Sequence, residues 1–278
     1  RAMAARGAPV VIAARDAAKL EATAAEIRQA TGSDKVETIL LDLASLASIR
    51  ACAAETKARL AKVDLLINNA GVMACPLGRT ADGFELQFGT NHLGHFVLTK
   101  HLLSLLEGES GGRIVNLSSR AHHMDEVHFD DPNYHHRDYD KWQSYGQSKT
   151  ANVLFSVALD QRLKPKGIDV LAVHPGGIMT NLGRHLTEED RTALMARVTA
   201  SDRSFSWKTV EQGAATSCWA ATAPELAGHG GVYCEDCHVA PVDDQSADGG
   251  VRSYAIDPDK AERLWALSEE LVGETFTA

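Results

Sequence analysis

Short apolar runs alternate along the chain with longer segments whose apolar residues recur every three or four positions. The runs predict buried strands, and the segments between them have the spacing of amphipathic helices. Strands that alternate with helices form a parallel sheet covered by helices on both faces, so the fold class is α/β. The predicted strands are 10–14, 38–43, 63–71, 113–119 and 168–177, with helices over 20–27, from residue 46, up to about residue 106 and from about residue 141.

Two polar segments interrupt this alternation, at residues 120–140 and 178–207. They fit a loop and a mobile lid, and substrate specificity is expected there because loops at the end of a rigid sheet carry binding residues. No internal repeat or low-complexity linker divides the chain. The pattern therefore predicts one domain over residues 1–278, with the substrate loop at about 178–207.

Composition supports one globular domain and argues against several classes of protein. A chain of 278 residues with 44% hydrophobic residues can bury one sizeable core. The net charge of -9 without a basic stripe argues against a nucleic-acid partner, which needs clustered lysine and arginine. No apolar stretch is long enough to cross a bilayer, so we expect no membrane span and a cytoplasmic location. The five scattered cysteines do not form a disulfide framework.

The segment WQSYGQSK carries candidate acid–base chemistry. Tyr145 and Lys149 are four residues apart on a predicted helix, so their side chains lie on one face. A neighbouring ammonium favours the phenolate and lowers the pKa of a phenol from about 10, which suits a general acid or base. The same spacing also occurs in solvent-exposed pairs without a catalytic role, so the surrounding sequence must decide.

That surrounding sequence places small and polar residues at the ends of neighbouring strands. Ser118 and Ser119 close one strand at the edge where parallel sheets bind ligands, and only one of them can face a substrate because successive side chains alternate. INNAG, at residues 67–71, ends the preceding strand and allows close approach of a ligand. Asn91 lies inside the next helix, where an asparagine is locally unfavourable.

INNAG, Asn91, IVNLSS, YGQSK and HPGG, in this order, resemble the short-chain dehydrogenase/reductase family over nearly the whole chain. Within it, HLGHFVLT, IVNLSSRAHH and VHPGG are similar to the branch with retinol dehydrogenases, WW-domain oxidoreductase and protochlorophyllide reductases. The resemblance implies a Rossmann-like, doubly wound parallel sheet in a three-layer α/β/α arrangement.

The resemblance also implies a role for each residue of the catalytic set. Tyr145 would give or take a proton, and Lys149 would lower its pKa and hold the nicotinamide ribose. Ser119 would hydrogen-bond the substrate oxygen. Asn91 would hold a water that connects Lys149 to solvent, although a helix-kinking asparagine bonded to backbone is an equally good description of the same residue.

Relatives in this family begin with a strand and a glycine-rich turn that places a helix N-terminus against the pyrophosphate. In this sequence the first glycines are Gly7 and Gly32, and RAMAARG has the pattern of the far end of the helix that such a turn starts. We therefore expect the first, central strand of the sheet to be absent from the given sequence, through truncation rather than decay. The two strands that flank it would then lack a partner.

The cofactor preference depends on the end of the first strand. Ala14 and Arg15 stand where an acidic residue would bind the adenosine ribose, and an arginine there can pair with a 2'-phosphate. The resemblance therefore favours NADP(H) over NAD(H), the alternative being a surface arginine without a ligand. The other cofactor-binding residues that it implies are Asp42, Leu43, Asn69, Ala70, Gly71, Tyr145, Lys149, Pro175, Gly176 and Thr180.

Two further patterns suggest metal or redox chemistry and are given little weight. CEDCH, at residues 234–238, matches a haem-attachment motif but follows a predicted strand, and a single cysteine pair is a poor zinc site; a redox role of Cys234 and Cys237 stays open. Histidines at 122, 123, 128, 135 and 136 lie near acidic residues, as in a solvated loop. We predict no catalytic metal.

The sequence as a whole predicts an NADP(H)-dependent oxidoreductase that interconverts an alcohol and a hydrophobic aldehyde or ketone by hydride transfer. One alternative is reduction of a C=C bond by the same family. The other is a non-catalytic protein that senses a dinucleotide or serves as a scaffold. A homo-oligomer is expected from the resemblance.

Overall fold

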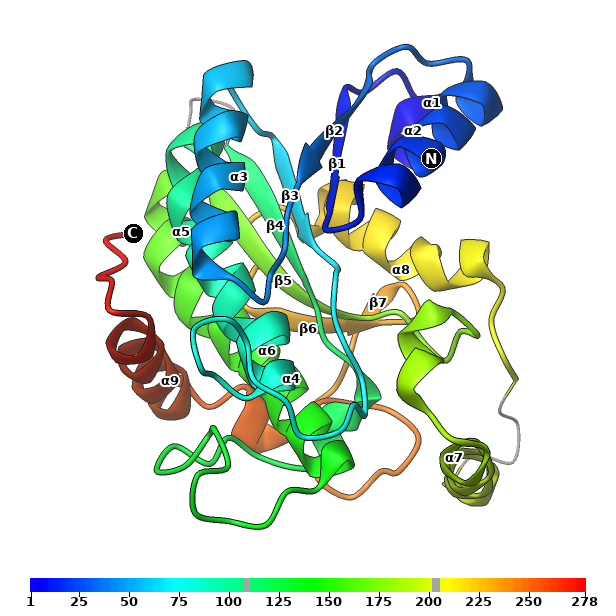
Figure 1. The fold of residues 1–278 in the computed structure, drawn as a ribbon, viewed down its shortest axis with the longest axis vertical. Coiled ribbons are helices and arrows are strands. Elements are labelled where there is room, and N and C mark those ends of the chain that lie inside the picture. The colour runs from blue at the N-terminus through cyan, green and yellow to red at the C-terminus, as the bar shows by residue number, and fades with distance from the viewer. Residues whose placement is uncertain (108–110, 202–205) are drawn as a thin grey trace.

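Two separate parallel sheets form the middle layer of the computed structural model, which describes residues 1–107, 111–201 and 206–278, with the backbone alone for 197–201 (Figure 1). The smaller sheet pairs β1 with β2, and the larger has the order β3-β4-β5-β6-β7, in which only the short β7 runs antiparallel to its neighbour. The strands are β1 (Val10–Ala14), β2 (Val36–Leu40), β3 (Leu65–Asn68), β4 (Gly112–Leu117), β5 (Ile168–His174), β6 (Val232–Glu235) and β7 (His238–Val239).

The division of the sheet confirms the expectation that two strands would lack a common neighbour. Within the described residues, β1 pairs only with β2 and β3 pairs only with β4. The edge position leaves Ile67 of β3 38% exposed, which is unusual for an isoleucine in a parallel sheet. The remaining strands follow the doubly wound α/β pattern.

Helices cover both faces of the sheets, as the alternating pattern predicts (Figure 1). One face is covered by α3, α5 and α6, with α9 packed behind α6; α2 and α8 lie on the other, with α1 beside α2. Several helices begin at a side chain that accepts a backbone N–H, namely Asp16, Ser45, Asp140, Thr209 and Asp257. The helices are α1 (Ala2–Ala5), α2 (Ala17–Thr31), α3 (Leu46–Arg59), α4 (Leu86–Phe88), α5 (Gly94–Leu106), α6 (Lys141–Leu163), α7 (Glu188–Ser201), α8 (Val210–Thr222) and α9 (Pro258–Val272).

Helix α6 runs through the centre of the largest hydrophobic core. Every residue from Ser144 to Asp160 is buried, so this helix has no solvent-exposed face over that length. An aromatic cluster lies between α5, α6 and α9, with ring centroids of neighbouring members 4.7–6.1 Å apart; its members are Phe96, Phe155, Trp265 and Phe276. The core therefore holds the segment with Tyr145 and Lys149 rigidly against the sheet.

The segment 178–207 differs from the expected loop. It contains a short 3₁₀ segment at Asn181–His185 and the helix α7, and an ion pair between Lys141 and Asp190 ties α7 to the start of α6. Residues 202–205 of the expected lid lie outside the described residues. In the part of the chain that the structure describes, no helix is both long and apolar enough to cross a membrane.

Candidate active site

Ser119 and Tyr145 come together at the carboxyl end of β4. Ser119 is the second residue after this strand, and its side chain is close enough to the phenol of Tyr145 to lower the pKa of the phenol. Tyr145 lies in the second turn of α6, whose start is fixed by Asp140 through the N–H groups of Trp142 and Gln143. Only 4% of Tyr145 is exposed. Ser119 and Tyr145 therefore lie at the edge where parallel sheets bind ligands.

The two serines that end β4 have different partners, which the sequence left open. Ser118 is buried and its hydroxyl donates to the Lys149 carbonyl oxygen over 2.9 Å, so it fastens β4 to α6. Ser119 accepts the Ala121 N–H over 3.1 Å, which leaves its own proton available to another acceptor. Ser119, the residue that the resemblance selects, is thus the one positioned toward the phenol.

Burial dominates the electrostatics of this site. It raises the pKa of Tyr145 to about 12, against a lowering effect of the Ser119 hydrogen bond. Burial also lowers the pKa of Lys149 to about 8. The expectation that Lys149 would lower the pKa of Tyr145 does not describe this structure, because the Lys149 ammonium donates to the Leu117 carbonyl at 3.0 Å and lies 5.6 Å from the centre of the tyrosine ring.

Asn91 lies in a π-helical turn, Gly89–Leu93, between α4 and α5. Its side-chain oxygen accepts the Val72 N–H, and its side-chain nitrogen donates to the Val72 carbonyl and to the Ser148 hydroxyl, each over 2.9 Å. Its backbone carbonyl accepts from Nδ1 of His95 at 2.8 Å. The description of Asn91 as an asparagine bonded to backbone therefore fits, and a water relay through it stays a prediction.

The residues expected to bind the nucleotide line the carboxyl edges of β1, β3 and β5. Asn69, Ala70 and Gly71 follow β3, and Pro175 and Gly176 follow β5. A Cβ on Gly71 would lie 2.9 Å from Oδ1 of Asn91 and 3.9 Å from Nζ of Lys149, so only glycine fits against them. Gly176 has φ +93°, a conformation that favours glycine, and the Lys208 side chain lies over it.

The remaining candidate cofactor-binding residues differ in their exposure and in the hydrogen bonds that they already make. Arg15, at the end of β1, is exposed and has no hydrogen bond or ion pair to the described residues, so its guanidinium is available to a phosphate. Asp42 accepts the Ala44 N–H with one carboxylate oxygen, and Leu43 is buried against Gly94. Thr180 is exposed and accepts the N–H of Leu182.

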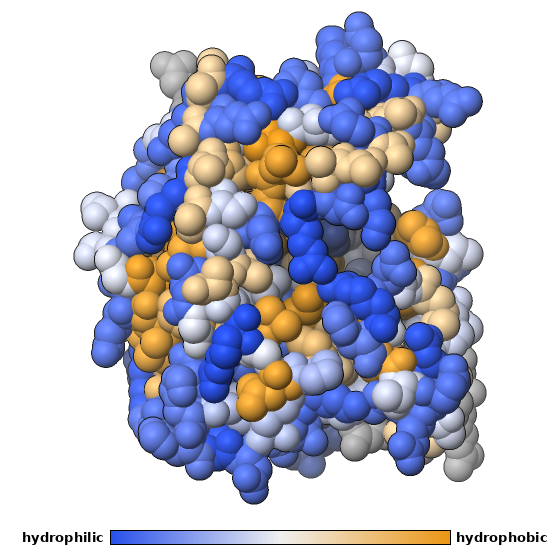
Figure 2. All heavy atoms as spheres, in the orientation of Figure 1, coloured by the Kyte–Doolittle hydropathy of each residue, from blue (hydrophilic) through white to orange (hydrophobic). Residues whose placement is uncertain are grey.

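The surface near these residues is hollowed. Figure 2 shows a depression in the face drawn in Figure 1, between the turn that follows β1 and helix α8. The glycines at 71 and 176 and the exposed guanidinium of Arg15 suit a dinucleotide with its phosphate groups.

Comparison with known proteins identifies the family. A family model described as short chain dehydrogenase matches residues 1–191. The chain belongs to the short-chain dehydrogenase family. It is 43% identical to human retinol dehydrogenase 13 over 275 residues, which cover 98% of this chain and 79% of that protein.

Solved structures of short-chain dehydrogenase relatives agree with the fold. An uncharacterized protein from Mycobacterium paratuberculosis has a TM-score of 0.72 and 36% identity, covering 99% of this chain and 87% of that one. The Pseudomonas aeruginosa RhlG/NADP active-site complex has a TM-score of 0.63 and 28% identity, covering 82% of this chain and 85% of that one.

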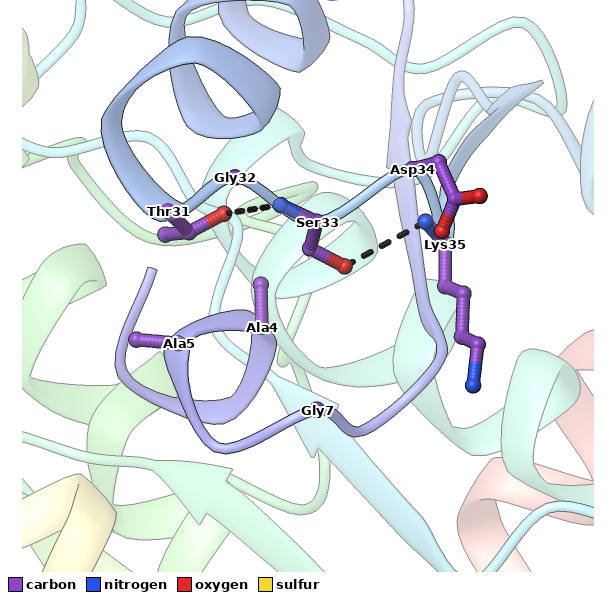
Figure 3. A pocket seen from close by; sticks show the side chains of 8 residues that line it. All are labelled: Ala4, Ala5, Gly7, Thr31, Gly32, Ser33, Asp34 and Lys35. Atoms are coloured by element: carbon purple, nitrogen blue, oxygen red, sulfur yellow. Dashed lines mark hydrogen bonds between the residues drawn. The ribbon is translucent and has the colours of Figure 1, made fainter.

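A shallow pocket elsewhere on this short-chain dehydrogenase lies far from its chemistry. It is formed by α1 and the turn between α2 and β2, and is lined by Ala4, Ala5, Gly7, Thr31, Gly32, Ser33, Asp34 and Lys35 (Figure 3). Gly7 precedes β1 and Lys35 precedes β2, so the pocket is at the amino ends of these strands. Ligands of such sheets bind at the opposite edge.

The histidine-rich loop and the CEDCH segment form no metal site in the residues that can be examined. Among the described side chains, no group of three or more His, Cys, Asp or Glu is arranged to hold a metal ion. Cys234 is buried beneath α8 with its pKa raised to about 12 by burial, whereas Cys237 is exposed in the β6–β7 turn. Both cysteines are free thiols.

Sequence reasoning missed two histidines that contact the backbone of the candidate active site. His122 is buried rather than solvated, and its Nδ1 lies 2.8 Å from the Ser119 carbonyl oxygen. His174 ends β5, and its Nδ1 accepts the Arg120 N–H over 3.3 Å. One indication of this was present in the sequence: His122 lies three residues after Ser119, and His174 directly precedes Pro175.

Proposed function

We propose that this short-chain dehydrogenase is an NADP(H)-dependent oxidoreductase that interconverts an alcohol and a hydrophobic aldehyde or ketone. The closeness of the Ser119 side chain to the Tyr145 phenol, with Lys149 beside them, is the observation that carries the proposal. Two hydroxyls that converge at a strand end can both bind one substrate oxygen, and a phenol can exchange a proton with it.

In this proposal, Tyr145 transfers the proton and Ser119 orients the oxygen. When a carbonyl is reduced, its carbon receives a hydride and its oxygen takes the proton of the Tyr145 hydroxyl. The nicotinamide supplies or accepts the hydride when bound. Ser119 keeps its proton for the substrate oxygen because the Ala121 N–H occupies one of its acceptor positions. Lys149 holds its ammonium at the Leu117 carbonyl and would contact the nicotinamide ribose.

The NADP(H) preference rests on Arg15. Arg15, Gly71, Pro175 and Gly176 would hold the nucleotide, with Arg15 at the 2'-phosphate. The similarity to RhlG, whose structure is a complex with NADP, supports this preference. NADPH is expected to raise the melting temperature more than NADH, and Arg15→Ala to remove the difference. Arg6→Ala, at another exposed arginine, serves as the control. If the difference between the NADPH and NADH shifts in melting temperature is unchanged in Arg15→Ala, the NADP(H) assignment is contradicted.

A hydrophobic substrate is supported by apolar side chains around the site. Met124, 40% exposed, packs against Gly146, the neighbour of Tyr145. Met179 and Trp207, at the two ends of the segment after β5, are 61% and 37% exposed. The name of retinol dehydrogenase 13 is also consistent with an apolar alcohol. We further propose a cytoplasmic homo-oligomer, to be tested by fractionation and by mass measurement.

The test of the function is Tyr145→Phe. Turnover of an apolar aldehyde should fall by about 10²- to 10⁴-fold while NADPH affinity, measured by fluorescence titration, is retained. Tyr134→Phe is the matched control, because the Tyr134 hydroxyl has no hydrogen-bond partner among the described residues. Unchanged turnover in Tyr145→Phe would refute the mechanism. Reduction of the C=C bond of an enone without carbonyl reduction would favour the alternative reaction, and NADPH binding without turnover of any substrate would favour a sensor.

A further inference from the structure

The peptide bond between Ser119 and Arg120 is held at both ends by histidine side chains. Its C=O belongs to Ser119 and lies 2.8 Å from Nδ1 of His122. Its N–H belongs to Arg120 and donates to Nδ1 of His174 over 3.3 Å. Because the peptide unit is planar, these two contacts fix the orientation of the whole unit. The two histidines come from different parts of the chain, the 3₁₀ segment Arg120–His123 and the end of β5.

The backbone contacts determine the tautomer of His122. Its Nε2 accepts the backbone N–H of Arg252 over 3.2 Å and must therefore carry no proton. In the neutral ring the proton is then on Nδ1, where it is donated to the Ser119 carbonyl. The ring is enclosed by Tyr233 and His123, at centroid distances of 4.8 and 4.4 Å. His122 is thus fixed in one orientation.

His174 has the opposite tautomer. Its Nδ1 accepts two backbone N–H groups, from Arg120 and from Gly176 at 3.4 Å, so this nitrogen carries no proton. The two donors share a single lone pair, which accounts for the length of both bonds. Through this one nitrogen, His174 connects the segment after β4 to the Pro175–Gly176 turn after β5.

Both arrangements require neutral rings. Burial lowers the pKa of His122 and of His174 to about 3. A protonated ring would direct an N–H at the backbone N–H of Arg252, or at those of Arg120 and Gly176. The charged and titratable groups around the two rings, from every neighbouring element, are Arg120, His123, Arg252, Lys208 and Asp236. Most of them are cationic and further disfavour the protonated rings.

We infer that His122 and His174 act together as positioning residues, a histidine clamp on the Ser119–Arg120 peptide that sets the Ser119 hydroxyl against Tyr145 and couples it to the Pro175–Gly176 turn. The inference rests on the proposed function for its consequence in catalysis. The hydroxyl of Ser119 is fixed by its own backbone, because it accepts the Ala121 N–H two residues later. A rotation of the clamped peptide would therefore move the hydroxyl away from the phenol.

The first test measures the tautomers directly and needs no turnover. Long-range ¹H–¹⁵N spectra of the histidine side chains at a pH of about 6 should show two neutral rings with opposite tautomers. The proton should be on Nδ1 in His122 and on Nε2 in His174. Assignment comes from His122→Phe and His174→Leu, each of which removes one signal set. A cationic ring, or the same tautomer at both positions, would overturn the clamp.

The second test asks whether the clamp acts through Ser119. His174→Leu should lower kcat by about 10- to 100-fold, since a misplacement of about 1 Å has effects of this size. His174→Asn keeps an oxygen acceptor near the position of Nδ1 and should remain within about threefold of the original kcat. In a Ser119→Ala background, His174→Leu should change the residual kcat by less than about twofold, because the group it positions is already absent.

Two further variants keep this test decisive. His122→Phe retains an aromatic ring against Tyr233 but removes the Nδ1 donor, so it gives the same comparison if His174→Leu fails to fold. His136→Leu, at an exposed loop histidine, is the control. Equal losses with and without Ser119 would overturn the clamp while leaving the proposed function intact. An inactive parent protein whose tautomers are as stated would contradict the proposed function alone.

Discussion

The side-chain amide of Asn91 bonds to both backbone groups of Val72. Its oxygen accepts the Val72 N–H and its nitrogen donates to the Val72 carbonyl, each at 2.9 Å. The side chain therefore satisfies both backbone groups of Val72, as the backbone of a paired strand would. The nitrogen also donates to Ser148, whose hydroxyl donates to the Tyr145 carbonyl at 2.8 Å. One buried amide therefore connects the segment after β3 with the backbone of α6.

Replacement of Asn91 by aspartate should be strongly destabilising. The carboxylate keeps the shape but loses both donated hydrogen bonds, and its oxygen faces the Val72 carbonyl. A buried group left unsatisfied in this way costs about 1–3 kcal/mol. The free energy of unfolding from urea titration at neutral pH measures the loss. Asn181→Asp, at an exposed asparagine, should leave it nearly unchanged. A stable, active Asn91→Asp protein would show that these bonds are dispensable.

Gly71→Ala should lower kcat by displacing the Asn91 side chain. The added methyl group would lie 2.9 Å from Oδ1 of Asn91, closer than a carbon tolerates, and 3.9 Å from Nζ of Lys149. We expect the Asn91 side chain to shift and kcat to fall by about 10- to 100-fold. Gly78→Ala is the matched control, because there the added methyl meets Leu86 at an ordinary 3.4 Å. Equal kinetics in the two variants would exclude this steric role.

Lys149→Met should inactivate the protein and stabilise it near neutral pH. Burial lowers the Lys149 pKa from 10.5 to about 8, so the folded state releases a proton that the unfolded chain still binds. The cost of the buried charge is fully present below pH 8 and is relieved as the pH rises from 8 to 10.5. Methionine removes the charge, and Asn152 still donates to the Leu117 carbonyl.

The measurement is the free energy of unfolding near neutral pH and in alkaline solution. Without the nucleotide, Lys149→Met should exceed the parent protein by about 1–3 kcal/mol near neutral pH and by less in alkaline solution. Lys62→Met, at an exposed position, controls for the loss of a positive charge. A less stable Lys149→Met protein at neutral pH would mean that the lysine contributes to the fold rather than straining it.

Buried histidines should make the protein sensitive to mild acid. Burial lowers the pKa of His92 and His122 to about 3 and that of His95 to about 4. In the unfolded chain they take up protons below pH 6.5, so stability is fully present above this pH and falls as the pH decreases toward 4. Each such ring adds a slope of up to about 1.4 kcal/mol per pH unit.

His92→Leu tests this origin of the pH dependence. Nδ1 of His92 has no hydrogen-bond partner in the described part of the chain. Ser268, which contacts Nε2, also donates to the Leu264 carbonyl, so leucine leaves no polar group unsatisfied. Unfolding titrations between neutral and mildly acidic pH should show a shallower slope for His92→Leu than for the parent protein. His229→Leu, at an exposed histidine, should retain the parent slope. Identical slopes in all three proteins would contradict the assignment.

The sequence predicted most of the strands and the catalytic pair for reasons that are local. Apolar runs and helical spacing are properties of neighbouring residues, and they located β4, β5 and α6 to within a few residues. The spacing of Tyr145 and Lys149 placed them on one helix face before any contact was known. The unpaired edges of β1 and β3 were also foreseen, because the order of strands follows from the family resemblance.

What the sequence did not predict depends on contacts between distant segments. The pKa of Tyr145 is governed by burial, which a Tyr–Lys spacing does not report. His122 was assigned to a solvated loop, but the backbone of Arg252, 130 residues later, encloses it. A loop was expected where the structure has helix α7, because the polar composition of this segment gives little sign of a helix. An ion pair with Lys141 attaches α7 to α6.

The π-helical turn at Gly89–Leu93 sets the phase of everything that follows it in the helix. It adds one residue to a turn, and so sets the direction of the buried Asn91 side chain relative to the buried residues of α5. Deleting one residue there would restore an uninterrupted α-helix and rotate Asn91 by about 100° relative to α5. Either the Asn91 amide would then point away from Val72, or the aromatic side chains of α5 would point away from the core. The length of this turn is therefore as important to the structure as the residues in it.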